Sequence, residues 1–371
     1  MSESRIVEDF IQLAKINSLS FAERGVADKI KELLAEIGIE AYEDDTKEAL
    51  NGNCGNLYAV WRGSLDIPPI LLSAHMDTVA PGIDKKPIVS EDKATIHSDG
   101  KTVLGADDLA GVVEIIEGIR KVIESKEEHR TVELLFPVAE EVYTKGSAKF
   151  DYTRFASKEA YCLDLSGNVG NAATSAPSLI SFKVEVRGKA SHAGFAPEEG
   201  INAISIAAKA ISKIDQGQVD ELSTVNIGKI SGGTATNIVS DVCVCEGEVR
   251  SFDHDRALSI IDNIKEEFNK VATNKGASIE FDYDIHIIAY KVLEDENVVT
   301  RFRKACEKIG VEPKLSSTLG GSDNNQFNVN GISGIVVACG MENVHTVNEY
   351  IAVENLYKGA ELVKELILSK N

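Results

Sequence analysis

The sequence predicts an α/β protein of two domains, one inserted into the other, and three observations lead to this prediction. The chain has 371 residues, of which 43% are hydrophobic. Because a typical domain has roughly 100–200 residues, more than one domain with its own core is expected. A strand, helix, strand order over residues 67–141 is typical of a parallel sheet. Residues 179–287 follow the β-α-β-β-α-β order of a ferredoxin-like unit.

The first predicted domain covers residues 1–177 and 288–371. Its strands are expected where short apolar runs end in polar or turn residues, at 57–63, 67–77, 131–141, 159–167 and 332–340. Its helices are expected where apolar residues recur at helical spacing, at the amino terminus, at 105–125, from residue 292 onward and at 354–370. A hairpin is predicted at 94–104, because Asp99-Gly100 between alternating residues is a strong two-residue turn signal.

The second predicted domain covers residues 178–287 and is expected to fold by itself. The predicted strands lie at 179–189, 222–230, 238–252 and 277–287, and the predicted helices at 200–214 and 255–275. Cys243 and Cys245 share one strand face, and a single thiol pair without other ligands is expected in the core rather than at a metal.

Composition excludes several classes of partner. The formal net charge is −20, so the surface repels polyanions and a nucleic-acid partner is not expected. No apolar run approaches the roughly 20 residues that span a bilayer, and no secretory signal is evident at the amino terminus. The six cysteines form no CxxC pair and are sparse for a disulfide framework, so a cytoplasmic location is predicted.

Two histidines and several acids stand where predicted core elements give way to polar sequence. They are His75 and Asp77 at the end of one strand, Asp107 and Asp108 at the start of a helix, Glu140 and Glu141 at the end of the next strand, Asp164 between two leucines, and His345 before the last helix. His75 and Asp77 are two residues apart and share a strand face, so Asp77 is placed to accept a hydrogen bond from the imidazole.

Each of these residues also has a simpler explanation when taken alone. A polar strand end explains His75, helix capping explains Asp107 and Asp108, and a solvated strand end explains the two glutamates. Taken together, imidazole and carboxylate donors without thiolate favour a divalent metal site of Zn, Co or Mn. The acids suffice for two ions that share one bridging carboxylate.

Six motifs, in this order, resemble the di-metal aminoacylase/carboxypeptidase family of metallopeptidases and its tripeptide aminopeptidase branch: LLSAHMDTV, TVLGADDLAG, PVAEEV, CLDLSG, GKASHAG and ENVHTVNEYI. The resemblance implies a zinc-exopeptidase-like catalytic domain, with a mixed sheet covered by helices, and an inserted lid and dimerisation domain. It also implies hydrolysis of short peptides from the amino end, and a homodimer formed through the inserted domain. An N-acyl-amino-acid deacylase or a dipeptidase of the same family is the alternative.

The resemblance further assigns roles at the predicted metal site. It implies two divalent ions, with zinc expected first and cobalt or manganese as alternatives. The implied ligands are His75, Asp107 and Asp164 for one ion and Asp107, Glu141 and His345 for the other, with Glu140 as general base and Asp77 as the carboxylate behind His75. A cis peptide bond is expected between Asp107 and Asp108.

The implied substrate-binding residues are His192, Asn237 and Arg250 in the inserted domain and Gly320 and Gly321 in the first domain. For His192 a surface histidine is the simpler explanation, and for Arg250 a surface ion pair. The chain departs from the tripeptidase pattern on both sides of this glycine pair. Leu319 stands where that branch has Arg before the two glycines, and Ser322-Asp323-Asn324 stands where it has Thr-Asp-Gly. The resemblance therefore does not extend to the binding of a tripeptide carboxylate by an arginine at this position.

Overall fold

The structure is a computed structural model that describes the backbone of residues 2–370 and the side chains of residues 5–370. The described chain forms two compact units, which meet at residues 175/176 and 290/291. The sequence predicted boundaries at 177/178 and 287/288. We call the unit formed by the two ends of the chain the first unit, and residues 176–290 the second unit.

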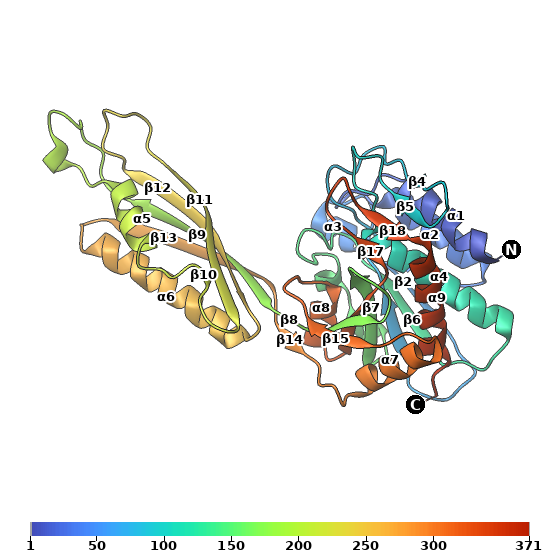
Figure 1. The fold of residues 1–371 in the computed structure, drawn as a ribbon. Helices are drawn as coiled ribbons and strands as arrows, with labels where there is room; N and C mark the ends of the chain where they lie inside the picture. The colour runs from blue at the N-terminus through green and yellow to red at the C-terminus, as the bar shows by residue number, and fades with distance from the viewer. Residues whose placement is uncertain (1, 371) are drawn as a thin grey trace. The chain divides into compact units, whose positions relative to one another are not determined.

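The first unit is built around a mixed nine-stranded sheet (Figure 1). The strands run in the order β1-β2-β6-β3-β7-β16-β8-β14, and β15 pairs with β8. Neighbouring strands are parallel from β6 to β16, whereas β1 and β2 are antiparallel to their neighbours. β8 is antiparallel to β16 and parallel to β15. The strands are β1 (Tyr42–Glu43), β2 (Leu57–Trp61), β3 (Ile70–Ser73), β6 (Val132–Phe136), β7 (Glu159–Leu165), β8 (Asn171–Ala176), β14 (Tyr290–Lys291), β15 (Lys314–Ser317) and β16 (Ser333–Ala338).

Helices cover both faces of this sheet, which explains why β3 and β6 are buried along their whole length. Ala160 and Cys162 of β7 pack with Phe327 of α8. The hydroxyl of Tyr161, which lies between them, donates to the carbonyl of Val298 in α7. Since alternate residues of a strand point to opposite faces, those two helices, α8 and α7, lie on opposite sides. The helices are α1 (Ser2–Ala14), α2 (Arg24–Glu36), α3 (Thr46–Leu50), α4 (Ala106–Ser125), η1 (Ser147–Lys149), η2 (Tyr152–Arg154), α7 (Asn297–Lys308), α8 (Asp323–Val329) and α9 (Val353–Leu368).

A small four-stranded sheet of order β17-β18-β5-β4 borders the start of α4 (Figure 1). Its strands are β4 (Ile88–Val89), β5 (Thr95–His97), β17 (Met341–Glu342) and β18 (Tyr350–Ala352). The hairpin predicted at 94–104 is wrong, because β5 pairs with β4 before it and with β18. The residues after Gly100 cannot pair back onto β5, since Val103 N–H donates to the carbonyl of Pro81 and Leu104 N–H to Glu349.

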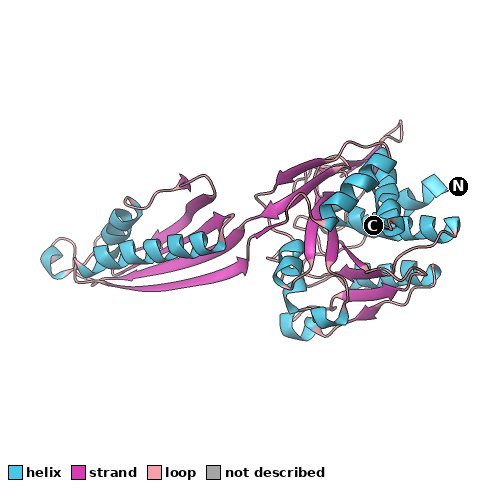
Figure 2. Ribbon diagram, turned by 90° about the horizontal axis from the view of Figure 1, so that it is seen from below, coloured by secondary structure: helices cyan, strands magenta, loops and turns pink. Residues whose placement is uncertain are grey.

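The second unit is a five-stranded antiparallel sheet of order β10-β11-β12-β9-β13 with two helices on one face (Figure 2). Leaving aside the short β10, this is the strand order of a ferredoxin-like unit, as predicted. Its core contains Cys243 and Cys245, and all six cysteines are buried free thiols. The elements are β9 (Ser178–Arg187), η3 (Pro197–Glu199), α5 (Ala203–Ile211), β10 (Gly217–Gln218), β11 (Ser223–Gly232), β12 (Val242–Ser251), α6 (His254–Thr273) and β13 (Ser278–Ile287).

None of the helices within residues 2–370 combines the length and the apolar character needed to cross a lipid bilayer.

Candidate metal centre

Three parallel strands of the first unit deliver polar side chains to one edge of the sheet. His75 and Asp77 follow β3, Glu140 and Glu141 follow β6, and Asp164 is the penultimate residue of β7. β3 lies between β6 and β7 and is parallel to both, so the carboxyl ends of all three meet. Ligand sites of open α/β sheets form at this edge.

Asp107 and His345 reach the same place from other elements. Asp107 stands at the start of α4, where its backbone and that of Asp108 are not yet helical. The peptide bond between these two residues is cis, which confirms the expectation from the sequence. His345 lies in the loop between β17 and β18. The site therefore combines five segments of the first unit.

The carboxylate of Asp107 lies between the two imidazoles. Its Oδ1 is 3.0 Å from Nε2 of His75, and its Oδ2 is 3.1 Å from Nε2 of His345. Nε2 of His345 is also 2.9 Å from Oε1 of Glu141. A carboxylate with one oxygen toward each histidine has the arrangement of a bridging ligand.

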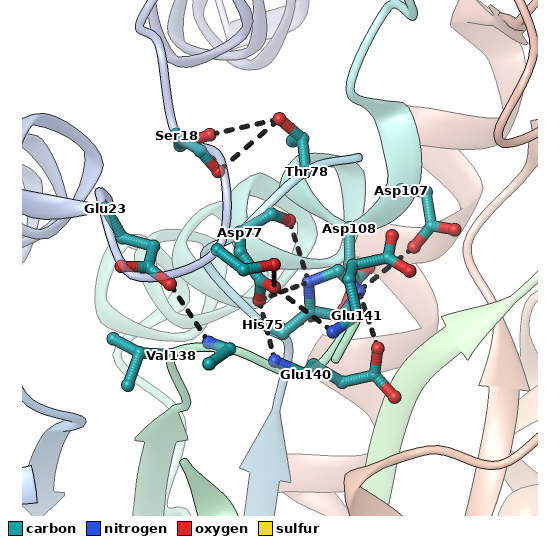
Figure 3. Close-up of polar contacts among 12 residues, drawn as sticks. Ser18, Glu23, His75, Asp77, Thr78, Asp107, Asp108, Val138, Glu140 and Glu141 are labelled. Carbon is teal, nitrogen blue, oxygen red and sulfur yellow. Dashed lines mark hydrogen bonds and ion pairs between the residues drawn. The ribbon is translucent and has the colours of Figure 1, made fainter. Parts of the chain in front are cut away.

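Two further acids complete the cluster around His75, and Figure 3 shows the first of them, Glu140, beside the imidazole. Nε2 of His75 is 3.9 Å from Oε2 of Glu140 and 3.8 Å from Oδ1 of Asp164. Among the described residues, two groups have donor atoms that all lie within 4.8 Å of one another, His75 with Asp107 and Glu141, and His75 with Glu140 and Asp164. The structure thus brings together all the predicted ligands and the predicted base.

The electrostatics of this cluster favour a bound cation. Burial, and then the charge of Asp164, raises the pKa of Glu140 well above its ordinary value. Burial also raises the pKa of Asp164, and the Asp107 carboxylate adds to the effect. Hydrogen bonds to Asp107 and Glu141 raise the pKa of His345 to about 11. Buried acids that repel one another are stabilised by a positive charge among them, and nitrogen and carboxylate donors suit a divalent metal ion.

Asp77 contacts the imidazole of His75 through its main chain and lies near it with its carboxylate. Nδ1 of His75 is hydrogen-bonded to the main-chain oxygen of Asp77 at 2.9 Å, whereas the nearest carboxylate oxygen is 3.4 Å away. Asp77 thus has two oxygens near Nδ1 of His75, one from its main chain and one from its carboxylate. With its proton on Nδ1, His75 presents the lone pair of Nε2 to the acidic cluster.

The carboxylate of Asp77 also accepts hydrogen bonds from the main chain of the two glutamates. Its Oδ1 accepts the N–H of Glu140 at 2.9 Å, and its Oδ2 accepts the N–H of Glu141 at 3.1 Å. Oδ2 also accepts the hydroxyl of Ser20 at 2.7 Å. Adjacent glutamates are thus fixed at the main chain while their side chains serve different parts of the site.

Three buried acids that support the site were not identified from the sequence. Oε1 of Glu23 accepts the N–H of Ala139, just before the glutamate pair. Asp323 accepts the hydroxyl of Ser147, and Glu349 accepts main-chain N–H groups ahead of Asp107. A signal existed for two of them, since Asp323 follows the predicted Gly320-Gly321 pair by two residues and Glu349 lies inside the motif ENVHTVNEYI. Glu23 carries no comparable signal.

The substrate-binding residues predicted for the inserted domain all lie in the second unit. His192 and Asn237 lie on adjacent segments, because Ala193 N–H donates to the carbonyl of Asn237 at 2.9 Å. Nδ1 of His192 accepts the N–H groups of Gly194 and Phe195, both at 3.1 Å, so its ring proton is on Nε2. Arg250 lies near the far end of β12, with its Nε 2.9 Å from Oε1 of Glu248.

Gly320 and Gly321 lie in the loop before α8. A Cβ added to Gly320 would meet only Oγ1 of Thr318, at the ordinary contact distance of 3.6 Å. Packing within the described residues therefore leaves room for a side chain at position 320. Leu319, beside it, has 64% of its surface exposed.

Comparison with known proteins identifies the family. The description "Peptidase dimerisation domain" matches residues 174–275, and "Peptidase family M28" matches residues 56–213. The uncharacterised protein YqjE of Bacillus subtilis is 36% identical over 99% of this chain and 98% of its own.

Two solved structures resemble the chain over nearly its whole length. The aminopeptidase PepT of Bacillus cereus is 37% identical with a TM-score of 0.94, covering 99% of this chain and 98% of the other. A tripeptidase of Staphylococcus aureus is 33% identical with a TM-score of 0.95 and the same coverage. With this identity across both units, the chain is a hydrolase that belongs to the peptidase T branch of the aminoacylase/carboxypeptidase family of metallopeptidases.

Proposed function

We propose that the protein is a di-zinc aminopeptidase that removes amino-terminal residues from short peptides, with tripeptides as the leading substrates. The observation that carries the proposal is the Asp107 carboxylate between His75 and His345, with one oxygen facing each imidazole. The likeness to an aminopeptidase and a tripeptidase supports the substrate class.

Two ions would be held by donors from the first unit. His75, Asp107 and Asp164 would bind one ion, and Asp107, Glu141 and His345 the other. Bound ions would supply Lewis-acid polarisation of the scissile carbonyl and would lower the pKa of a water molecule. Zinc suits this donor set best, and cobalt and manganese are the alternatives.

Glu140 would serve as the general base. Its carboxylate is buried beside His75 and Asp164, where a raised pKa suits a group that must gain and lose a proton near neutrality. Its carboxylate would take the proton of the attacking water and deliver it to the nitrogen of the leaving amine. Asp77 would keep Glu140 in place through its main-chain N–H.

The second unit would act as a lid and as the dimerisation domain, so that the protein is a homodimer. The match of residues 174–275 to a peptidase dimerisation domain supports this role. His192 would stabilise negative charge on the substrate oxygen through its Nε2–H, and Asn237 and Arg250 would bind the substrate. We also propose a cytoplasmic location, because all six cysteines are free thiols, as in proteins of a reducing compartment.

Gly320 and Gly321 would let the backbone of their loop approach the substrate. Leu319 bears on the choice of substrate. It replaces a basic residue of the tripeptidase pattern, and its side chain cannot bind a carboxylate. If the enzyme prefers substrates that lack the carboxylate of a tripeptide, its activity is that of an acyl-amino-acid deacylase or a dipeptidase.

The test is hydrolysis of matched dipeptides, tripeptides and N-acyl-amino acids by metal-stripped protein, before and after addition of Zn, Co or Mn. Metal-restored release of amino-terminal residues from tripeptides would support the proposal. Cleavage of acyl substrates alone would assign the protein to the deacylases. Absence of cleavage with every metal would contradict an enzymatic role.

A further inference from the structure

We propose that Glu349 is a positioning residue of the metal centre, whose carboxylate fixes the main-chain segment that delivers Asp107 to the two histidines. The inference rests on the proposed metal-binding role of Asp107 and His345. In this role Glu349 would bind neither the metal nor the substrate, and would act through the backbone of Asp107.

The carboxylate of Glu349 accepts three main-chain N–H groups from one short segment. Oε2 is 2.6 Å from the nitrogen of Leu104 and 2.9 Å from that of Gly105. Oε1 is 3.0 Å from the nitrogen of Asp107 itself. Only 1% of the surface of Glu349 is exposed, so these bonds are shielded from water. Bonds from N–H groups to a buried carboxylate are among the strong hydrogen bonds of proteins.

These donors have no helical partner of their own, because the first N–H groups of a helix lack acceptors within it. The start of α4 is irregular, and neither Gly105 nor Asp107 has a helical backbone. Without an acceptor of two oxygens at this point, several buried N–H groups would stay unpaired. Glu349 therefore determines where the backbone of Asp107 stands.

The other side of the segment is confined by packing. A Cβ added to Gly105 would lie 3.1 Å from Cγ2 of Thr78 and 3.3 Å from Cε of Lys85. Lys85 is 3% exposed, and its Nζ donates to the hydroxyl of Thr78 at 3.1 Å. Burial lowers the pKa of Lys85 to about 8, and the negative charge of Glu349 acts against that shift. The segment is thus held between Glu349 and a buried lysine.

Glu349 also connects Asp107 to the second histidine. It lies four residues after His345, and its N–H donates to the carbonyl of Thr346 at 3.2 Å. Its carbonyl accepts the N–H of Ser98 at 3.1 Å. One anchored segment therefore carries His345 and fixes Asp107, so the distance between these two ligands depends on Glu349.

The test compares Glu349→Gln with wild type and with Glu354→Gln. Glutamine keeps the size of the side chain, but it replaces one accepting oxygen with an NH₂ group that faces N–H donors. Glu354 is a matched control five residues on, because its exposed carboxylate pairs with Lys358. Zinc affinity is measured by competition with a chromogenic chelator, and the cobalt form by its visible absorption.

We expect Glu349→Gln to lower zinc affinity by roughly 10–100-fold, the range for residues that orient metal ligands, and to change the cobalt spectrum. Glu354→Gln should match wild type in both measurements. A folded Glu349→Gln protein with wild-type affinity and spectrum would overturn the inference, even if it were less stable.

If Glu349→Gln does not fold, the zinc affinity and cobalt spectrum of Glu349→Asp are measured in its place. Aspartate keeps the charge but is one methylene shorter and cannot reach all three N–H groups, so a smaller loss of zinc affinity is expected. Wild-type affinity in that variant would overturn the inference. A wild-type protein that binds no metal in this assay would instead contradict the proposed function, and the inference with it.

Discussion

Asp77 shows how one residue organises the candidate metal centre through its main chain and side chain together. Its carbonyl oxygen fixes the tautomer of His75, while its carboxylate holds the backbone of Glu140 and Glu141. A fully buried carboxylate is tolerated only when several donors satisfy it, and here Ser20 supplies another. The bonds that satisfy Asp77 are thus the same bonds that align the proposed metal ligand His75 and the proposed base Glu140.

Removing the base and removing the bridging ligand should have different effects. Glu140→Ala is expected to lower kcat by about 10²–10⁴-fold, the usual contribution of general acid–base catalysis, while bound metal stays near the wild-type level. Asp107→Ala is expected to lose both metal and turnover, because its two oxygens face both histidines. Metal content after dialysis and peptide turnover separate the two cases, with the exposed Glu127→Ala as control. Near-normal turnover in Glu140→Ala would make the base assignment wrong.

His192 provides a prediction for the second unit. Because two backbone N–H groups bind its Nδ1, the ring has a fixed donor at Nε2. His192→Ala should therefore lower kcat by about 10²–10³-fold, as the loss of a donor to a developing oxyanion does, without changing the metal content. Lys189→Ala, an exposed neighbour outside this turn, should leave both unchanged. Unchanged kinetics in His192→Ala would reduce it to a surface residue.

The candidate metal ligands could be predicted from the sequence, whereas the residues that support them largely could not. His75, Asp107 and Asp164 stand at the ends of apolar runs, which marks them even without a structure. Glu23 and Glu349 act on the backbone of segments more than a hundred residues away in the chain. No spacing within a local window can reveal such a bond, since it depends on the tertiary fold.

At the scale of elements, long periodic segments were predicted well and short ones poorly. The helix predicted at 105–125 closely matches α4 (Ala106–Ser125), because its apolar pattern spans many turns. The hairpin predicted at 94–104 failed, because the N–H of Leu104 is taken by Glu349 and not by a partner strand. A turn signal such as Asp99-Gly100 indicates where a chain can reverse direction. It does not determine which strand pairs with the strand before the turn.

The packing of α4 against α9 gives a stability prediction. A Cβ added to Gly118 would lie 2.4 Å from Cγ1 of Val363 and 3.0 Å from the carbonyl of Ala360. Gly118→Ala should therefore destabilise the first unit by about 1–3 kcal/mol through overpacking. This cost exceeds the gain of roughly 1 kcal/mol that alanine normally brings to a helix interior.

Urea unfolding, followed by circular dichroism, measures the change in the free energy of unfolding. The control is Lys304→Ala on the exposed face of α7, which also introduces alanine into a helix of the first unit. It should change the free energy by no more than about 0.5 kcal/mol. A Gly118→Ala protein as stable as wild type would mean that the two helices can separate without cost.

At the scale of the whole molecule, the proposed chemistry divides between the two units. All five proposed metal ligands and Glu140 belong to the first unit, whereas His192, Asn237 and Arg250 belong to the second. Residues 176–290 are inserted between β8 and β14, so the first unit assembles its ligands from both sides of the insertion. Metal uptake should therefore depend on the first unit, and substitutions in the second should act on turnover and assembly.

Assembly through the second unit gives the last prediction. Beyond Val225, β11 pairs with no strand other than β12 among the described residues, and the N–H of Ile227 donates to Oε1 of Gln216. Ile230, further along this strand, is 54% exposed. We expect a homodimer of about twice the 40.1 kDa chain mass by light scattering. Ile230→Asp should yield monomers, because a charged side chain at an edge strand opposes pairing with a second copy. Leu293→Asp, equally exposed at 55% but in the first unit, should remain dimeric. A wild-type monomer at micromolar concentration, or a dimeric Ile230→Asp protein, would contradict assembly through this strand.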